Sequence, residues 1–148
     1  MEKIRVTIWN EFRHEKTKEN VKAIYPDGLH ATIKAFLDKN EDLEVRLAAL
    51  DDPDQGLPDD VLENTDVLLW WGHMAHDKVP DKIVEKIHKR VLAGMGLVVL
   101  HSGHHSKIFR ALMGTTCNLR WRDGDRERIW TVNPAHPIAK GIPAHFSL

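Results

Sequence analysis

The chain has 148 residues, of which 42% are hydrophobic and 29% charged, and its formal net charge is -1. This length fits one domain with a real core, and the near-neutral charge excludes the basic excess that marks a nucleic-acid-binding domain. The single cysteine, Cys117, excludes an intramolecular disulfide, and no apolar run approaches the ~20 residues that cross a bilayer. We therefore expect a cytoplasmic protein that binds neither nucleic acid nor membranes.

The first half of the chain alternates strand-like and helix-like segments. β-branched residues predict a strand over residues 4–9, which a long polar loop follows over residues 10–27. Apolar residues at helical spacing predict a helix over residues 28–37. A second strand is predicted over residues 43–50, and a short helix over residues 58–64.

The second half continues the alternation with shorter and more apolar strands. Its predicted elements are a strand over 66–72, a helix over 80–93, a strand over 96–100, a helix over 106–113, a strand over 128–132 and a loop over 134–148. The third strand is apolar throughout, as expected where helices cover both faces of a parallel sheet, so we expect both Trp70 and Trp71 to lie in the core. Strands alternating with helices predict a parallel, doubly wound α/β sheet.

Histidines gather where the predicted strands end. Of the ten histidines in the chain, His14 follows the first strand and His73 and His76 follow the third. Three more, His101, His104 and His105, follow the fourth strand. Doubly wound sheets bind ligands beyond the carboxyl ends of their strands, so we expect the functional site there. The alternative for each histidine is a helix-capping or solvent-exposed role.

Two of these histidines, His73 and His101, follow buried strands directly and are the strongest candidates for chemistry. Together with His14, His76 or Asp77 they match the ligand types of a catalytic zinc site, which takes three protein ligands. Histidine is also the usual acid or base near neutral pH. The sequence leaves metal binding and acid–base catalysis both open.

No nucleophile stands out in the sequence. A nucleophile elbow at Ser102 would need glycines at the positions of Leu100 and His104. Gly103 does permit a sharp turn, where backbone N–H groups could bind an oxyanion or a sugar hydroxyl. Cys117 follows a helix rather than a strand, so we expect a structural thiol there. Cysteine-dependent hydrolysis is the least favoured hypothesis.

Several runs, taken together, resemble the ThuA-like (trehalose utilisation) family over essentially the whole chain. These are Trp9-Asn10-Glu11-Phe12-Arg13-His14-Glu15, Trp70-Trp71-Gly72-His73 with His76-Asp77, Leu100-His101-Ser102-Gly103-His104, Leu119-Arg120-Trp121-Arg122 and His136-Pro137-Ile138. The resemblance implies a flavodoxin-like three-layer sandwich with a mainly parallel sheet, as in class I glutamine amidotransferases. It also implies that residues 1–148 are a single domain, C-terminally incomplete relative to the family.

The resemblance further implies a role in disaccharide metabolism, around trehalose or keto-sugar intermediates. Class I amidotransferases carry a cysteine at the elbow, where this chain has His101-Ser102-Gly103, so we exclude a cysteine-dependent amidotransferase. We expect a metal-dependent sugar isomerase or hydrolase, with zinc as the metal. The expected catalytic residues are His14, Glu15 and His101; the substrate-binding residues Asn10, Glu11, Trp71, Ser102, Gly103 and His104; and the metal ligands His73, His101 and His14.

The alternative hypothesis is a non-catalytic carbohydrate-binding or regulatory module that retains the fold without the nucleophile. It predicts sugar binding without turnover. In both hypotheses the partner is a small sugar. The unpaired sheet edge left by missing strands would favour a homo-oligomer.

Overall fold

A computed structural model describes residues 2–148, and these residues divide into two compact units. The first unit extends to Asn118, and the second comprises Leu119–Leu148. The expectation of one domain over residues 1–148 stays a prediction.

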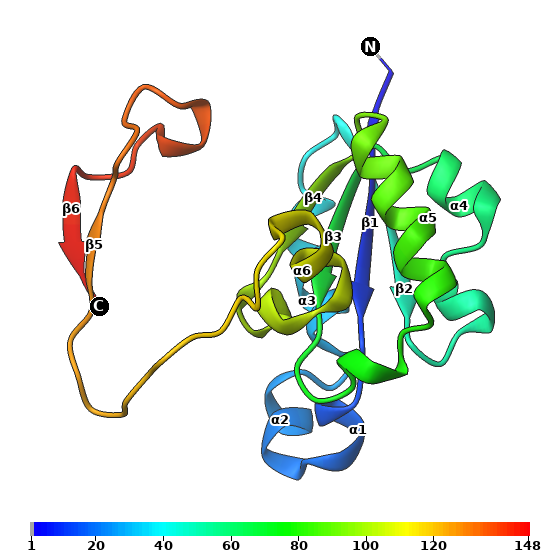
Figure 1. Cartoon of the computed structure of the whole chain (residues 1–148), viewed down its shortest axis with the longest axis horizontal. Coiled ribbons are helices and arrows are strands. Elements are labelled where there is room, and N and C mark those ends of the chain that lie inside the picture. The colour runs from blue at the N-terminus through cyan, green and yellow to red at the C-terminus, as the bar shows by residue number, and fades with distance from the viewer. Residues whose placement is uncertain (1) are drawn as a thin grey trace. The chain divides into compact units, whose positions relative to one another are not determined.

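The first unit is built on a four-stranded parallel sheet (Figure 1). The strands are β1 (Ile4–Asn10), β2 (Leu43–Ala49), β3 (Val67–Trp71) and β4 (Gly96–Val99), in the order β2-β1-β3-β4. Each neighbouring pair is parallel, with Val6 opposite both Val45 and Val67. The first four of the five predicted strands are thus confirmed, and the order is that of a flavodoxin-like doubly wound sheet.

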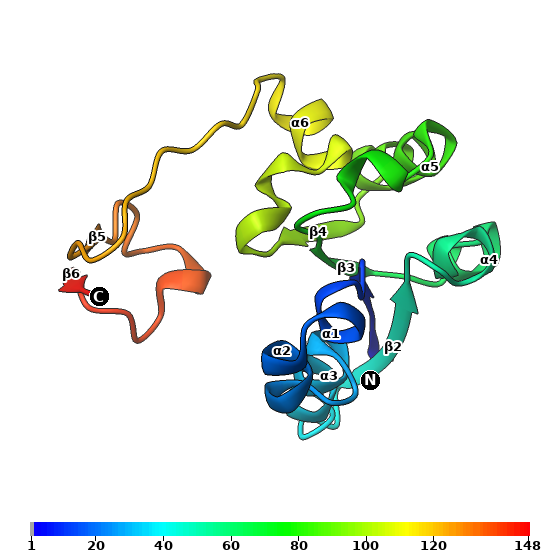
Figure 2. The same cartoon turned by 90° about the horizontal axis from the view of Figure 1, so that it is seen from below.

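Helices cover both faces of this sheet (Figure 2). The helix α3 (Leu29–Leu37) packs against β1 and β2 on one face, and the opposite face carries α4 (Asp59–Glu63), α5 (Asp81–Leu92) and α6 (Lys107–Met113). This layering follows from right-handed crossovers between parallel strands. The result is the predicted three-layer α/β sandwich.

The main core lies between the sheet and the helices α4, α5 and α6. Successive strand residues point to opposite faces, so Trp9, Leu68 and Trp70 share one face, where the rings of Trp9 and Trp70 stack at 3.8 Å between centroids. Fully buried apolar residues of the three helices complete this core: Leu62, Ile83, Ile87 and Ile108. The amphipathic spacing of α5 therefore determines which of its sides packs on the sheet.

The structure corrects the expectation that Trp70 and Trp71 are both in the core. Trp70 is 1% exposed, whereas Trp71 is only partly buried. Trp71 lies on the opposite face of β3, and the helix α3 on that face packs over β1 and β2. Alternation along the strand thus places Trp71 where the helical layer does not fully cover the sheet.

Two predicted loops contain short regular elements. Residues 10–27 include α1 (His14–Thr17) and α2 (Glu19–Ile24), and residues 134–148 include β6 (His145–Ser147). These elements of three to six residues are too short to show a periodicity in the sequence. The predicted helix over 106–113 begins instead at Lys107, because Ser106 is its N-cap.

The second unit contains a small antiparallel pair, β5 (Arg128–Trp130) with β6, which confirms the start of the strand predicted over 128–132. Large apolar side chains in this unit are exposed, among them Trp130 and Val132. A two-stranded sheet of this size has little apolar surface to bury. The hydrophobic core accordingly lies in the first unit.

Within residues 2–148, no helix combines the length and apolarity that crossing a membrane requires.

The core predicts the response of stability to truncation at Leu68, which is fully buried near the start of β3. We expect Leu68→Ala to lower the free energy of unfolding by about 2–5 kcal/mol, because a cavity replaces packed atoms. Leu92→Ala is the control, since Leu92 is 73% exposed, and we expect a change within about 0.5 kcal/mol. Urea denaturation measures both; equal losses would contradict this account of the core.

Candidate functional site

The carboxyl ends of β1, β3 and β4 lie at one edge of the parallel sheet, and the segments that follow them carry the predicted histidines. We call these residues the histidine rim: His14, His73, His76, His101, His104 and His105. In the structure the rim is divided into two groups of neighbouring rings. His14 lies next to His73, and His105 lies next to both His76 and His104.

The loop after β3 is held by the carboxylate of Glu11, which is 1% exposed. This carboxylate accepts hydrogen bonds from the backbone N–H groups of His73 at 2.7 Å, Met74 at 3.0 Å and Ala75 at 3.0 Å. Three donors satisfy a buried carboxylate that would otherwise be strongly destabilising. Glu11, predicted to bind substrate, is thus engaged by the protein's own backbone.

The same loop brings His73 against His14 of α1. Their rings meet edge to face with centroids 4.7 Å apart, and His14 Nδ1 lies 3.8 Å from Glu11 Oε1. Trp71 stands beside both rings, at 6.0 Å from His14 and 6.5 Å from His73. We call His14 and His73 the histidine dyad.

The position of His14 depends on α1, which is tied to the end of β2. Arg13 and Lys16 form ion pairs with Asp51 at 2.8 and 3.1 Å. These pairs are partly exposed and individually weak. Arg13 and Lys16 nevertheless share the carboxylate of Asp51 and flank His14 in the sequence. Their ion pairs therefore orient the short helix from which His14 projects.

Burial lowers the pKa of His14 from its usual 6.5, and the neighbouring His73 lowers it further, against the opposing effect of Glu11. At neutral pH the His14 imidazole is therefore predominantly uncharged. Its Nδ1 atom is buried and has no hydrogen-bond partner within residues 2–148. A neutral imidazole next to a second imidazole is an arrangement that can accept and return a proton.

A second buried network joins β1 to α3 through Asn10, Glu15 and His30. The Asn10 amide donates to Glu15 Oε1 at 2.8 Å and lies 3.0 Å from His30 Nδ1, and the N–H of Leu29 donates to Glu15 Oε1 at 3.0 Å. Burial alone would raise the pKa of Glu15. The hydrogen bonds from the Leu29 N–H and the Asn10 amide act in the opposite direction, and the pKa is lowered overall. Asn10 and Glu15 therefore hold α3 against the sheet.

His30 was missed by the sequence analysis, which treated it as one residue of an amphipathic helix. It is 7% exposed, and burial lowers its pKa. Its packing against Phe12, with ring centroids 4.8 Å apart, could not be read from spacing, because the two residues are 18 positions apart.

His101 occupies the turn directly after β4, with a φ of 38°. Positive φ values are uncommon for residues other than glycine and are concentrated at functional turns. The turn closes on β3 at Gly103, where a Cβ would lie 2.8 Å from Val99 Cγ1 and 3.2 Å from the Trp70 carbonyl oxygen. The glycine is required there by this close approach, and Ser102 between the two is partly buried.

His104 and His105 pack together after this turn, with ring centroids 4.2 Å apart, and His105 is 6.4 Å from His76. His104 Nδ1 lies 2.6 Å from the carbonyl oxygen of Cys117, consistent with donation to it. That contact holds the segment after α6. The expectation that His104 binds substrate stays a prediction, and its Nδ1 is engaged within the protein.

The predicted metal ligands His14, His73 and His101 are not all brought together. The dyad unites two of them, whereas His101 is in none of the close ring pairs found among residues 2–148. Within the same residues, no group of three or more His, Cys, Asp or Glu side chains is arranged to hold a metal ion. The reason is the turn after β4, which fixes His101 separately from the loop that carries His73.

A pocket of about 400 Å³ lies beside the dyad, between the loop after β3 and α6. We call it the basic pocket; its lining residues are His73, Met74, His76, Asp77, His105, Lys107 and Arg110. Its volume is in the range of small-molecule sites. Lys107 and Arg110 were not among the predicted site residues. They are three positions apart on α6, and this spacing places both on one side of the helix.

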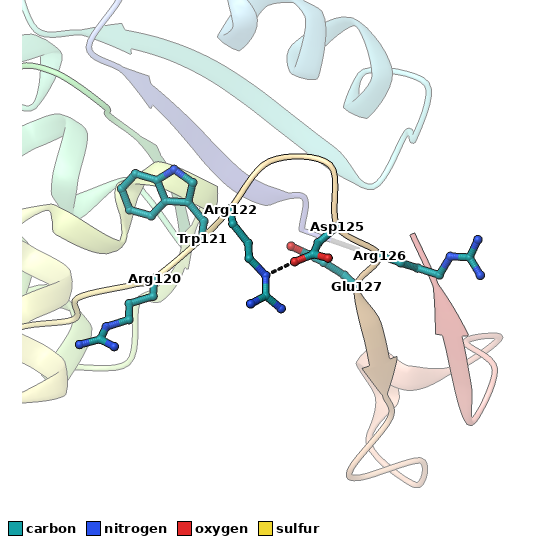
Figure 3. Close-up of a pocket in the computed structure, with 6 residues that line it drawn as sticks. All are labelled: Arg120, Trp121, Arg122, Asp125, Arg126 and Glu127. Carbon is teal, nitrogen blue, oxygen red and sulfur yellow. Dashed lines mark hydrogen bonds and ion pairs between the residues drawn. The ribbon is translucent and has the colours of Figure 1, made fainter.

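The second unit has its own hollow, of about 450 Å³ (Figure 3). Its six lining residues all come from the segment 120–127, and Arg122 forms an ion pair with Asp125. Trp121 is 79% exposed. A hollow formed by one exposed segment lacks the buried polar groups that position a ligand, so the rim is the better candidate site.

A parallel sheet in the order β2-β1-β3-β4, with candidate functional groups beyond the carboxyl ends of its strands, defines a flavodoxin-like α/β protein. Its fold is that of the class I glutamine amidotransferase-like proteins. The chain belongs to the ThuA family, described as trehalose utilisation, whose model matches residues 5–148. No curated protein matches the chain.

The contacts of Glu11 predict that Glu11→Gln destabilises the protein. The amide has one acceptor oxygen where the carboxylate has two, and its NH₂ group would face backbone donors. We expect a loss of about 1–3 kcal/mol in the free energy of unfolding. The control is Glu63→Gln, an exposed glutamate at the end of α4. Urea denaturation at pH 7 measures both, and an unchanged stability of Glu11→Gln would refute the role of the carboxylate.

Proposed function

We propose that this protein is an enzyme of disaccharide utilisation that transfers a proton on a keto-sugar, with the histidine dyad as its acid–base pair. Membership of the trehalose utilisation family supports a sugar as the substrate. The observation that carries the reaction is the 4.7 Å approach of His14 and His73 next to the buried carboxylate of Glu11.

In this proposal His14 begins neutral, because its pKa is lowered by burial and by the neighbouring His73. It accepts the proton from the carbon next to the sugar carbonyl, and the electron pair of that C–H bond forms an enediolate. His73 donates a hydrogen bond to the carbonyl oxygen. His73 then passes the hydroxyl proton of the adjacent carbon to the former carbonyl oxygen, and His14 returns its proton to the former carbonyl carbon. The carbonyl thereby moves to the adjacent carbon and the sugar is isomerised, so the reaction needs no oxidant and no second substrate.

Glu11, Asn10 and Glu15 act as positioning residues in this scheme. Glu11 fixes the backbone that carries His73, and Asn10 and Glu15 connect β1 to α3. Glu15, expected from the sequence to be an acid or base, is 4% exposed and accepts from Leu29 and Asn10. The proposal therefore moves the acid–base role from Glu15 to His73.

Thiol chemistry is not part of the proposal. The elbow position after β4 carries His101, and Cys117 lies beyond α6 with its Sγ next to Thr115 Oγ1 at 3.3 Å. A nucleophilic cysteine needs a neighbouring base or cation that lowers its pKa. The contacts of Cys117 within residues 2–148 are with Thr115 and His104, and the latter is made through the Cys117 carbonyl.

The alternative function is a non-catalytic carbohydrate-binding module. Trp71 favours it, because a partly buried indole beside two imidazoles offers an apolar surface to a sugar ring. In this alternative the dyad only donates and accepts hydrogen bonds with sugar hydroxyls. Proton exchange distinguishes the two, since a binding module would leave the carbon-bound protons of the sugar untouched.

The test of the proposed reaction is deuterium exchange into a keto derivative of trehalose in D₂O, followed by proton NMR. We expect the wild-type protein to exchange the proton next to the carbonyl, and His14→Ala and His73→Ala each to slow this exchange by about 10²–10⁴-fold. The control is His88→Ala, which changes a histidine on α5 away from the rim. Exchange at the uncatalysed rate with wild-type protein would support the binding module instead.

The pH dependence adds an independent readout. If neutral His14 is the base, exchange is fastest above its pKa and is lost as the pH falls through that value, which lies below 6.5. His73 contributes to that lowering, so His73→Ala should raise the pKa of His14. Histidine NMR titration measures this shift even where the variant is inactive.

Metal assistance by zinc is a second proposal for the same dyad, in which His14 and His73 would be ligands and the ion would polarise the sugar carbonyl. Because the described residues supply no group of three protein ligands, we expect an ion bound at the dyad to be held weakly and lost on dialysis. Elemental analysis of dialysed wild-type and His73→Ala protein tests this. One zinc ion per chain, absent from the variant, would establish the dyad as a metal site.

A further inference from the structure

Arg110 is the cation of the basic pocket for which the described part of the chain shows no partner. It lines the basic pocket from α6, and within residues 2–148 its guanidinium forms no ion pair and no hydrogen bond. An unpaired guanidinium presents up to five N–H donors in a planar arrangement that matches the oxygens of a phosphate or carboxylate. The pocket therefore contains donors that its own acceptors do not satisfy.

The other charged groups of the pocket are already paired. Lys107 Nζ donates to Asp81 Oδ1 at 2.7 Å and to the carbonyl oxygen of Val79 at 2.8 Å. The one carboxylate in the lining, Asp77, forms an ion pair with Lys78 at 3.2 Å. Arg110 thus remains as the uncompensated charge, and the lining has a surplus of positive charge.

Imidazole groups supply the remaining polar surface. His73, His76 and His105 all line the pocket, and each can donate an N–H to a ligand oxygen. His76 and His105 lie on opposite sides, one on the loop after β3 and one before α6, with their rings 6.4 Å apart. Donors from two separate elements therefore surround the space next to Arg110.

We infer that the basic pocket binds an oxyanion substituent of the sugar, a phosphate or a carboxylate, through Arg110 and the imidazole N–H groups of His76 and His105. This inference rests on the proposed function, because His73 belongs both to the dyad and to the pocket lining. A sugar with its reacting carbon at the dyad would direct its charged substituent into the pocket. The substrate is then an anionic sugar.

A neutral disaccharide fits this lining less well. Sugar hydroxyls bind best where acceptors and donors alternate and an aromatic ring offers a stacking surface. The lining has a single carboxylate, Asp77, already paired with Lys78, and its rings are the imidazoles. Arginine instead forms its strongest hydrogen bonds with charged oxygens.

Calorimetry with the whole chain tests this inference, using inorganic phosphate, glucose 6-phosphate, glucuronate and, as the neutral probe, glucose. The proteins are wild type, Arg110→Gln and the matched control Arg46→Gln, which changes an exposed arginine on β2. We expect at least one anionic sugar to bind wild type tenfold or more tightly than glucose. Arg110→Gln should remove that preference, and Arg46→Gln should retain it.

The pattern of anions identifies the substituent. Tight binding of glucose 6-phosphate and inorganic phosphate supports a phosphate, and tight binding of glucuronate supports a carboxylate. Equal affinities for all four probes, or equal losses in Arg110→Gln and Arg46→Gln, would overturn the inference.

The outcome is separable from that of the proposed function. Deuterium exchange without any preference for anions would overturn the anion pocket and leave the dyad in place. A preference lost in Arg110→Gln, in a protein that exchanges no proton, would support the pocket and overturn the proposed reaction.

Discussion

The carboxylate of Glu11 accepts three consecutive backbone N–H groups, from His73 to Ala75, and the geometry of the candidate site depends on this interaction. A charge that is 1% exposed is tolerated only when its hydrogen bonds are satisfied. Glu11 follows β1 and the three donors follow β3, so one side chain connects the ends of adjacent strands. The positions of His73, and through it the dyad and the basic pocket, follow from that connection.

In the segment after β1, burial affects the two glutamates, Glu11 and Glu15, differently from His14. Glu11 and Glu15 remain compatible with burial because backbone and amide donors surround them. His14 has a buried Nδ1 without a hydrogen-bond partner in the described chain, and its pKa is lowered as a result of burial and of His73. An imidazole kept neutral at physiological pH is a better proton acceptor than one that is already charged.

The turn after β4 carries the imidazole of His101 and no cysteine thiol. His101 has the positive φ of a strained turn, and Gly103 makes the close approach to β3 that the turn requires. A scaffold of this kind positions groups at strand ends irrespective of the reaction, so function has to be argued from the residues there. In this chain those residues are imidazoles and cations, which suit proton transfer and anion binding.

The amino-acid sequence by itself determined the order of the four sheet strands and of the helices α3 to α6, since these strands are short runs rich in β-branched or apolar residues and the longer helices have an apolar face. It also placed six histidines at strand ends, and the resemblance to the trehalose utilisation family followed from local motifs. Only the tertiary structure decided that His14 meets His73, that Glu15 and His30 are buried, that Trp71 is only partly covered and that Arg110 lines a pocket with three imidazoles. Those properties depend on contacts between segments tens of residues apart, and sequence periodicity carries no information about the distance between two such segments.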